Sequence, residues 1–543
     1  MYWLGISGGV LAGNQDGAAC LLRDGRIVAA VEEERLLGIK HANGQLPRRA
    51  IEHCLARAGI GLRDVAAVGF PGITWAGFDA TLRDYLLLHF GHAPEIRLLD
   101  HHLAHAASSY GFSGLDDALV LTLDFSGDRT STALFHARGD AIEPVLRIAR
   151  PNSLGLFYSM LTQYLGFGRD DEEYKVMGLA SYGEPRFDLS EILRPEGESY
   201  RVNPAFVKSA LRPDLPAPSK QEGLFAPLPL PRPHRVAGEK LEPYHMDVAA
   251  SAQRALEEAV LNLLRHAAPK SPSRHLCLAG GVALNCAMNR LIRESGLFDS
   301  LFVPPHVSDA GLALGCAALL SLEGQRVRPE PIAGCDWGPR FSDEEIEKVL
   351  ERCGVRAERP EDLCAAVARD LAEGRIVGWF QGGLEFGPRA LGSRSILADP
   401  RHAAMKDRVN HAVKLREGFR PFAPSCLEER AAEWFVDSVK SPYMTITFEV
   451  KPGQRQRVPA ITHVDGTARV QSVGRAASPL FHRLISEFER RSGVPMLLNT
   501  SLNVQGQPIV ADPRAALGLL YSTGLDGLAI GSFYLRKSID HWS

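Results

Sequence analysis

The sequence lacks the features that would place it in a disulfide-stapled, zinc-binding or membrane class. Its 543 residues contain nine cysteines, an odd number, and none of them forms a Cys-x-x-Cys pair. That pattern argues against both a zinc site and a disulfide framework. The longest apolar stretches, such as 311–320, are too short and too rich in glycine to cross a bilayer. The first residues carry no basic segment followed by an apolar run, so we expect a cytoplasmic protein with no membrane partner.

The chain also lacks an excess of charge of either sign. It has 61 Lys and Arg against 64 Asp and Glu, a formal net charge of −3. This balance argues against a nucleic-acid partner, because such proteins usually carry a basic face. With 45% hydrophobic and 23% charged residues, the composition is that of an ordinary globular protein. A chain this long exceeds what one hydrophobic core usually supports, so we expect at least two domains.

What the sequence does have is a repeated junction between an apolar strand and a glycine-rich loop. Glycines let the backbone approach phosphate oxygens, and a helix N-terminus beyond them favours negative charge. A single junction of this kind is usually a plain tight turn. Duplicated hairpins between such junctions predict an α/β fold of the actin-like, two-lobed ATP-binding type. The strands and their loops are 4–6 with 7–17, 118–123 with 124–128, and 275–279 with 280–285.

Composition breaks divide the chain. Seven prolines between 211 and 235 exclude a helix or a central strand, so this stretch is a surface excursion or a linker. A second break, 323–339, precedes a new helical pattern, and we therefore predict domains at 1–335 and 336–543. The other expected elements are a helix at 246–268 in the first domain, and in the second a helix at 342–352, a strand at 376–380, a helix at 405–413 and a strand at 444–450.

A candidate metal site begins with His101 and His105, which lie four residues apart and would share one face of a helix. Such pairs also occur on protein surfaces without a metal. Asp124 at the end of a strand and Asp309 before a helix favour the metal interpretation. Two histidines with two aspartates suit Fe(II), Mn(II) or Zn(II). His102 would point elsewhere and is expected to be structural.

Candidate anion-binding residues lie in the second half. The segment 381–392 combines glycines with Arg389, and 414–424 carries three cations in a proline-bounded loop. Guanidinium groups pair with phosphate or carboxylate oxygens through two parallel hydrogen bonds. A solvated basic turn is the alternative. The segment 499–503 then supplies hydroxyl and amide groups after an apolar strand, either to complete an oxyanion site or simply as capping residues.

Taken together, these segments resemble the NodU/CmcH-type carbamoyltransferases, a family that includes the tobramycin O-carbamoyltransferase and other enzymes that modify antibiotics and nodulation factors. The resemblance extends over essentially the whole chain. The residues that carry it lie at 32–35, 40–41, 101–105, 173–180, 280–285, 308–311, 385–392, 419–424, 463–467 and 499–503.

The resemblance implies a transfer domain like that of the tRNA threonylcarbamoyl transferases, followed by an α/β domain like that of the threonylcarbamoyl-adenylate synthases. The second domain would make carbamoyl-adenylate from carbamoyl phosphate and ATP, with Mg. The first would pass the carbamoyl group to a hydroxyl or amine of a small molecule, such as a secondary metabolite in antibiotic biosynthesis. The resemblance leaves open whether the protein forms a homo-oligomer.

The resemblance also assigns roles to residues. Carbamoyl phosphate would be bound by four of them, and Lys40 matches a lysine near the reacting centre. Iron would be bound by His101, His105, Asp124 and Asp309. The carbamoyl-phosphate residues are Arg389, Lys414, Arg420 and Ser501, and the nucleotide-binding residues are Asp16, Gly127, Gly280, Gly281, Asn285 and Asn499.

One position departs from the family pattern. The family usually has His-Asp after the first strand, where the histidine is a candidate general base, and this chain has Gln15-Asp16. An amide cannot accept the proton of an attacking hydroxyl at neutral pH. Three explanations are open: another group serves as the base, the acceptor is an amine or an acidic hydroxyl, or transfer has been altered or lost. The alternatives to the main hypothesis are a nucleotide-binding relative without transfer and an enzyme that acts on tRNA or protein.

Overall fold

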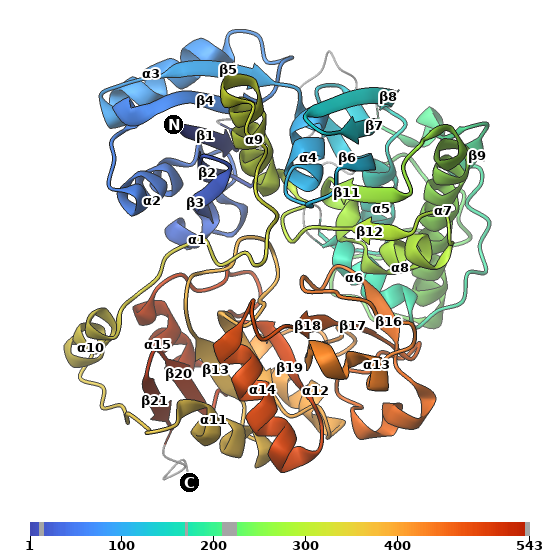
Figure 1. Ribbon diagram of the computed structural model, residues 1–543. Helices are drawn as coiled ribbons and strands as arrows, with labels where there is room; N and C mark the ends of the chain where they lie inside the picture. Colours follow the sequence, from blue (N-terminus) through green and yellow to red (C-terminus); the bar gives the residue numbers. More distant parts are fainter. Residues whose placement is uncertain (10–15, 169–171, 209–224, 538–543) are drawn as a thin grey trace. The chain divides into compact units, whose positions relative to one another are not determined.

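A computed structural model describes residues 1–9, 16–168, 172–208 and 225–537 (Figure 1). The chain divides into two compact units. The first consists of Met1–Val28 and Asn43–Ile332, and the second of Ala29–Ala42 and Ala333–Ser543. The segment Ala29–Ala42 therefore belongs by its contacts to the second unit, although it lies in the first tenth of the sequence. The predicted division into domains at 335/336 stays a prediction.

The first unit contains two five-stranded sheets with the same topology. One has the order β3-β2-β1-β4-β5 and the other the order β8-β7-β6-β11-β12. In both, the first strand pairs antiparallel with the second and parallel with the fourth. This duplication is the two-lobed actin-like arrangement expected from the repeated strand and glycine pattern. The strands are β1 Tyr2–Ser7, β2 Ala18–Arg23, β3 Arg26–Glu32, β4 Val65–Pro71, β5 Glu95–Leu99, β6 Asp117–Gly127, β7 Thr130–Arg138, β8 Ala141–Ala149, β11 His275–Ala279 and β12 Ser300–Phe302.

Helix α9 (Leu312–Gln325) packs closely against strand β1 and helix α4 (His101–Tyr110), because glycines at these contacts carry no side chain. A Cβ added to Gly5 of β1 would lie 1.8 Å from the Ala313 carbonyl oxygen. A Cβ on Gly315 would lie 1.8 Å from the Ala104 carbonyl oxygen of α4. These contacts allow no larger residue, so the glycines bring α9 close to both β1 and α4.

The remaining elements of the first unit include a long helix, α7 (Pro243–Ala267), which confirms the helix expected at 246–268. Of the proline-rich stretch, 211–224 lies outside the described residues, and 225–235 is described without a helix or a strand. The other helices and strands are α2 Arg48–Ala58, α3 Phe78–Phe90, α5 Leu154–Tyr164, α6 Glu173–Ala180, α8 Cys286–Glu294, β9 Leu193–Glu196 and β10 Ser199–Val202.

The second unit is built on a seven-stranded mixed sheet of order β18-β15-β19-β14-β13-β20-β21. It is an α/β unit, as expected, and α11 packs against α14 beside the sheet. The sheet strands are β13 Val377–Phe380, β14 Arg394–Ala398, β15 Ala423–Leu427, β18 Gln471–Val473, β19 Met496–Ser501, β20 Gly527–Ile530 and β21 Phe533–Arg536. A separate pair is β16 Thr447–Glu449 with β17 Thr467–Arg469, and the helices are α1 Glu33–Leu37, α10 Asp343–Arg352, α11 Leu363–Ala372, α12 Ala404–Arg408, α13 Ala431–Trp434, α14 Pro479–Ser492 and α15 Pro513–Ser522.

The helix expected at 405–413 is only partly α-helical. It starts as α12 and continues from Val409 to Lys414 as a π-helix, labelled η8. The strand expected at 444–450 is shorter than predicted and is limited to β16. In the described part of the chain, no helix is both long and apolar enough to cross a membrane.

Candidate functional site

Helix α4 presents two histidines on one face. The side chain of Asp100 accepts a hydrogen bond from the Leu103 amide at 2.8 Å and so caps the start of the helix. His101 lies in the first turn and His105 one turn later. Both side chains are buried, with 8% of His101 and none of His105 exposed. The spacing of four residues therefore places both imidazole rings on one face of α4, as expected.

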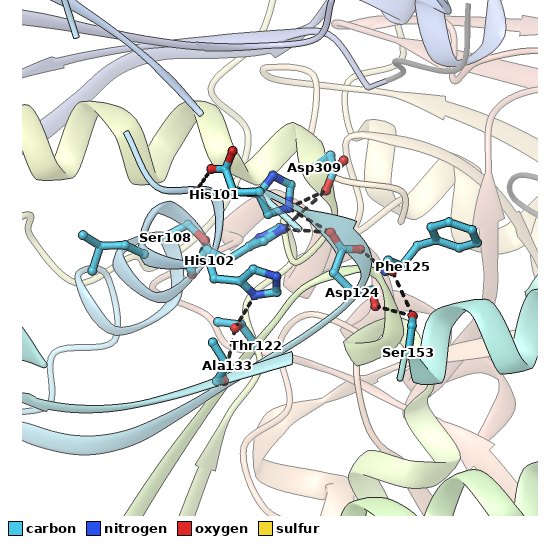
Figure 2. Close-up of polar contacts among 12 residues, drawn as sticks. His101, His102, Ser108, Thr122, Asp124, Phe125, Ala133, Ser153 and Asp309 are labelled. Carbon is cyan, nitrogen blue, oxygen red and sulfur yellow. Dashed lines mark hydrogen bonds and ion pairs between the residues drawn. The ribbon is translucent and has the colours of Figure 1, made fainter. Parts of the chain in front are cut away.

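The two histidines face two aspartates. His101 Nε2 is 2.9 Å from Asp124 Oδ2 and 3.8 Å from Asp309 Oδ1 (Figure 2). His105 Nε2 is 3.6 Å from the same Asp124 oxygen and 3.3 Å from Asp309 Oδ1. One possible ligand atom from each of the four residues lies within 4.8 Å of the others. The structure thus brings together all four residues proposed as metal ligands.

Three elements place the aspartates opposite the histidines. Asp124 lies near the end of β6, and its Oδ1 accepts a hydrogen bond from the Phe125 amide at 2.8 Å, so Oδ2 is the oxygen close to His101. Asp309 begins a short 3₁₀ turn, η7 (Asp309–Gly311), directly before α9. Because α9 packs closely on α4, this turn lies beside the histidines.

The electrostatics of the group follow from its burial and its opposite charges. Burial opposes protonation of His105, but Asp124 and Asp309 outweigh this effect and raise its pKa to about 9. Burial also opposes ionisation of Asp124, yet hydrogen bonds and charge from His101 and His105 hold its pKa well below the usual range. The protein therefore favours the ionised carboxylate of Asp124, which is what a bound cation would require.

The donor set fits a divalent metal ion. Imidazole nitrogen and carboxylate oxygen are ligands for borderline cations such as Fe(II), Mn(II) and Zn(II). Among the described residues, Nδ1 of His105 is buried without a hydrogen-bond partner, and the Nε2 atom is the one that faces both carboxylates. The residues present suit a metal, and its identity stays a prediction.

His102 has the structural role expected for it. It is fully buried, and its Nδ1 lies 2.7 Å from the Thr122 hydroxyl (Figure 2). That hydroxyl donates to the Ala133 carbonyl at 3.2 Å, so His102 Nδ1–H is the donor to Thr122. Burial, with the neighbouring His101 and His105, lowers the pKa of His102 to about 3. His102 is therefore neutral and connects α4 to β6.

Three glycines expected to bind nucleotide pack against this group. A Cβ on Gly127 would lie 2.0 Å from the His101 ring. Gly280 has φ +88°, and a Cβ there would lie 2.1 Å from a backbone oxygen of β6. A Cβ on Gly281 would lie 3.4 Å from Asp124 Oδ1. Packing around the histidine and aspartate group explains Gly127 and Gly280, and contact with a nucleotide stays a prediction.

Asn285 is the N-cap of α8, and its side-chain oxygen accepts a hydrogen bond from the Met288 amide at 3.0 Å. It also exchanges hydrogen bonds with the amide of Gln253, at 2.8 and 3.0 Å. Tyr158 donates to the same Gln253 oxygen at 2.8 Å. The Asn285 amide is therefore fixed within the protein, and its role toward a nucleotide stays a prediction.

Asp16 lies at the edge of the described residues. It has φ +59°, and its carbonyl accepts a hydrogen bond from the Ser7 hydroxyl at 2.9 Å. Gln15, the departure from the family pattern, lies outside the described residues. Its consequence for proton transfer stays open.

In the second unit, Lys414 is buried among oxygen atoms. Its ammonium nitrogen lies 2.8 Å from the Ser501 carbonyl oxygen and 3.2 Å from the Ser501 hydroxyl. It also lies 2.8 Å from the Asn503 carbonyl oxygen and 2.6 Å from its side-chain oxygen. The Ser501 hydroxyl donates to the same Asn503 side chain at 2.6 Å. Lys414 and Ser501 are thus brought together as predicted, and Asn503 joins them.

Other cations surround Lys414. Burial lowers its pKa well below the usual value, and the positive charges of Arg416, Arg420 and Lys40 lower it further. The side chain of Arg420 is 15% exposed, and a carboxylate oxygen of Glu417 lies 3.7 Å away. We refer to Lys40, Lys414, Arg416 and Arg420 as the basic cluster. A site of this charge attracts a small polyanion.

Lys40 belongs to the second unit because the segment Ala29–Ala42 does. Its ammonium nitrogen lies 3.6 Å from Glu34 Oε2. Glu32 and Arg35 hold the segment in place: Glu32 accepts from the Gly387 amide at 2.7 Å, and Arg35 donates to the Gly387 carbonyl at 3.0 Å. Lys40 therefore lies with the basic cluster, and its role in the reaction stays a prediction.

Arg389 follows Gly387 in a loop whose backbone is fixed on several sides. Glu385 Oε1 accepts hydrogen bonds from the amides of Leu391 at 2.9 Å, of Ser393 at 2.6 Å and of Arg394 at 3.1 Å. Asn499, expected to bind nucleotide, donates to the Ala390 carbonyl at 3.1 Å, and its role toward a nucleotide stays a prediction. Its side-chain oxygen is buried without a hydrogen-bond partner among the described residues.

Asn503, Glu385 and Arg35 lie in segments singled out from the sequence, but none of them was predicted to have a role of its own. The segment 499–503 was expected to complete an oxyanion site, and in the structure Asn503 contacts Lys414. Nothing local indicates that Glu385 folds back on its own loop or that Arg35 bonds to Gly387. Both contacts depend on the tertiary structure.

Comparison with known proteins identifies the class. The family described as carbamoyltransferase N-terminus matches residues 79–318, and the family described as carbamoyltransferase C-terminus matches residues 368–537. The chain belongs to the carbamoyltransferase family and is an enzyme of that type. The cluster of two histidines and two aspartates lies in the N-terminal match, and Lys414, Arg420 and Ser501 lie in the C-terminal match.

Relatives within the family match along most of the chain. The nodulation protein NolNO of Sinorhizobium fredii is 40% identical, over 100% of this chain and 84% of that protein. The nodulation protein NolO of Bradyrhizobium diazoefficiens is 41% identical, over 82% of this chain and 80% of that protein. An uncharacterised protein of Synechocystis is 38% identical, over 98% of this chain and 96% of that protein.

Proposed function

We propose that this carbamoyltransferase works in two steps, first making carbamoyl-adenylate in the second unit and then transferring the carbamoyl group in the first unit. The acceptor is a hydroxyl or an amine of a small molecule. The observation that carries the proposal is that the chain has two chemically different polar clusters, one in each unit. One suits a polyanion, and the other suits a metal ion with a phosphate.

The first step has a defined balance. Carbamoyl phosphate, ATP and one water give carbamoyl-adenylate, pyrophosphate and phosphate. Water would first take the phosphoryl group of carbamoyl phosphate, breaking its P–O bond and leaving carbamate and phosphate. A carbamate oxygen would then form a bond to the α-phosphorus of ATP while the bond to the pyrophosphate oxygen breaks. Lys414 and Arg420 would bind the carbamoyl phosphate dianion and offset its loss of hydration. They would also stabilise negative charge that develops at the α-phosphate. Arg389 and Ser501 would complete the binding of the same anion.

In the second step, the acceptor oxygen or nitrogen forms a bond to the carbamoyl carbon, and the bond to the adenylate oxygen breaks to release AMP. His101, His105, Asp124 and Asp309 would hold a divalent cation. A metal held by these residues would supply positive charge toward the phosphate of the leaving AMP. Gly280 and Gly281 would let the backbone approach the adenylate. Lys40 would steady the oxyanion or position the nucleotide near the reacting centre.

Measuring the two steps separately tests the proposal. Purified protein with carbamoyl phosphate, ATP and Mg²⁺ should release pyrophosphate, and mass spectrometry should detect carbamoyl-adenylate. Arg389→Ala and Ser501→Ala should abolish both signals, whereas Arg514→Ala, at an exposed site of α15, should leave them unchanged. His101→Ala should still release pyrophosphate and should accumulate the intermediate.

The result also separates the proposal from its alternatives. A nucleotide-binding relative that has lost chemistry would release no pyrophosphate in any of these reactions. An enzyme acting on tRNA or protein would form the intermediate but carbamoylate no small hydroxyl or amine in a screen of acceptors. Either result would overturn the corresponding part of the proposal.

A further inference from the structure

The loop that carries Lys414, Arg416 and Arg420 of the basic cluster has an unusual backbone. Helix α12 changes into the π-helix Val409–Lys414, in which hydrogen bonds span one residue more than in an α-helix. Leu415 follows with φ 51° and ψ 51°, a left-handed conformation that branched residues rarely adopt. Its side chain is 61% exposed, so burial of that side chain does not explain the conformation. Other contacts must favour this backbone.

Asn410 makes those contacts. Its backbone carbonyl accepts hydrogen bonds from the amide of Leu415 and, at 3.1 Å, from the amide of Arg416. Its side-chain oxygen accepts from Arg416 Nε at 2.7 Å, and its side-chain nitrogen donates to the Arg420 carbonyl at 3.3 Å. Asn410 is completely buried. One amide side chain therefore bonds to both ends of the segment 416–420.

Arg416 is fixed on its other sides as well. Its guanidinium donates to the Pro421 carbonyl at 3.3 Å and lies over the Phe422 ring, 4.5 Å from the ring centre. Phe422 is itself buried. A planar guanidinium can bond along one edge and stack on an aromatic face at once, which a lysine cannot do. The geometry gives Arg416 a part in folding the loop.

We propose that Asn410 and Arg416 form a positioning pair that fixes the 414–420 loop, so that Lys414 and Arg420 converge on the bound anion. This inference rests on the proposed function, because it takes carbamoyl phosphate as the anion. Asn410 acts through Arg416 and the Arg420 backbone and does not touch the substrate. The π-turn and the left-handed Leu415 are then the means by which Lys414 faces Ser501 while the chain reverses toward Arg420.

Binding of phosphonoacetamide, a stable analogue of carbamoyl phosphate, tests the pair by calorimetry on the full chain. Asn410→Asp keeps an acceptor for Arg416 but places a carboxylate oxygen against the Arg420 carbonyl. Arg416→Lys keeps the positive charge but loses the planar guanidinium group that bonds to Asn410 and stacks on Phe422. Each should weaken analogue binding by about tenfold to a hundredfold, the cost of a misplaced binding group. The double variant should lose less than the sum of the two single losses, because the two residues share the contact between Arg416 Nε and the Asn410 side-chain oxygen.

Asn262→Asp is the matched control. Asn262 lies in the first unit and donates to the carbonyls of Gly197 at 3.0 Å and Ser199 at 2.9 Å, so its variant loses a comparable amide contact elsewhere. It should bind the analogue as the wild type does. If Asn410→Asp does not fold, analogue binding by Arg416→Lys alone tests the positioning pair.

The outcomes distinguish this inference from the proposed function. If the wild type binds the analogue and Arg420→Ala does not, the anion site stands. Unchanged binding by folded Asn410→Asp or by Arg416→Lys would then overturn the positioning pair alone. If the wild type itself neither binds the analogue nor releases pyrophosphate, the proposed function and this inference both fall.

Discussion

A single buried histidine, His306, illustrates how burial sets the charge of a side chain. Its Nε2–H donates to the Ser108 carbonyl at 2.9 Å, and its side chain has no exposed surface. Burial lowers its pKa to about 4, although that hydrogen bond acts in the opposite direction. In an unfolded chain the pKa of histidine is about 6.5. The neutral side chain therefore contributes stability that is complete above about pH 6.5 and is lost as the pH falls toward 4.

We expect His306→Gln to flatten this pH dependence. A glutamine amide can still donate a hydrogen bond but takes up no proton in this range. Urea unfolding of both proteins at pH 7, 6 and 5, with a chelator present, measures the free energy of unfolding. The wild type should lose more of it between pH 7 and 5 than the variant does. Parallel curves would show that His306 does not titrate on unfolding.

At the scale of elements, the hairpin between β6 and β7 determines where α4 begins. Asp128 lies in its turn with φ 46°, and its carboxylate accepts hydrogen bonds from the His101 amide at 2.9 Å and the Thr74 amide at 3.0 Å. Gly127 lies directly against the His101 ring. Because β6 also carries Asp124, this hairpin sets the distance between the strand and helix ligands.

We therefore expect Gly127→Ala to weaken metal binding. The added methyl group would overlap the His101 ring, which would have to move away from Asp124. Displacing a ligand in this way should lower metal affinity by about tenfold to a hundredfold. Competition with a chromophoric chelator, using Mn²⁺ or Zn²⁺ as the probe, measures the affinity.

Gly518→Ala is the control for this experiment. Gly518 lies in α15, where an added Cβ meets nothing within 4 Å. Alanine favours a helix over glycine, so this variant should be at least as stable as the wild type and bind metal equally well. Equal metal affinity in Gly127→Ala would mean that the hairpin does not set the ligand geometry.

Helices and strands with a regular hydrophobic pattern or clear sequence signals at their ends could be predicted from the sequence. The irregular elements could not. The amphipathic spacing of α7 and the apolar run of β11 agree with the structure to within a few residues. The π-turn in η8 could not be found, because a shift of one hydrogen bond leaves no mark on local composition. It depends on tertiary contacts such as the one from the Gly524 amide to the Ala412 carbonyl, at 2.8 Å.

The same division holds for the site. Fixed spacing on one helix predicted the common face of His101 and His105. The end of a strand indicated Asp124, and the start of a helix indicated Asp309. The fourfold oxygen environment of Lys414 and the attachment of Lys40 to the second unit could not be read from the sequence. Both join residues many positions apart, and the pairing is decided by the whole fold.

At the scale of the whole molecule, we expect Arg35 to stabilise the second unit, although it lies near the start of the sequence. Its side chain is 3% exposed and contacts Glu32, Glu34 and the Gly387 carbonyl. Arg35→Ala would remove the cation beside the buried Glu32 carboxylate, at a cost of about 3–5 kcal/mol. Hydrogen exchange should speed up in 385–394 and stay unchanged in strands β6 and β7.

Arg483→Ala provides the comparison within the same unit. Arg483 forms an exposed ion pair with Asp362 at 2.7 Å, and its side chain is 58% exposed. Loss of such a pair costs about 0–1 kcal/mol, so exchange should hardly change. Faster exchange confined to the first unit in Arg35→Ala would contradict the grouping of Ala29–Ala42 with the second.

The path of the chain between units has a consequence for its synthesis. The polypeptide enters the second unit at Ala29, leaves it after Ala42 and does not return until Ala333. On the ribosome, Glu32, Arg35 and Lys40 emerge long before Gly387 and Lys414 exist. Domains generally fold as units as they are translated. Here the second unit cannot fold completely from residues 333–543 alone. The segment 29–42 must stay available for pairing until those residues have been translated.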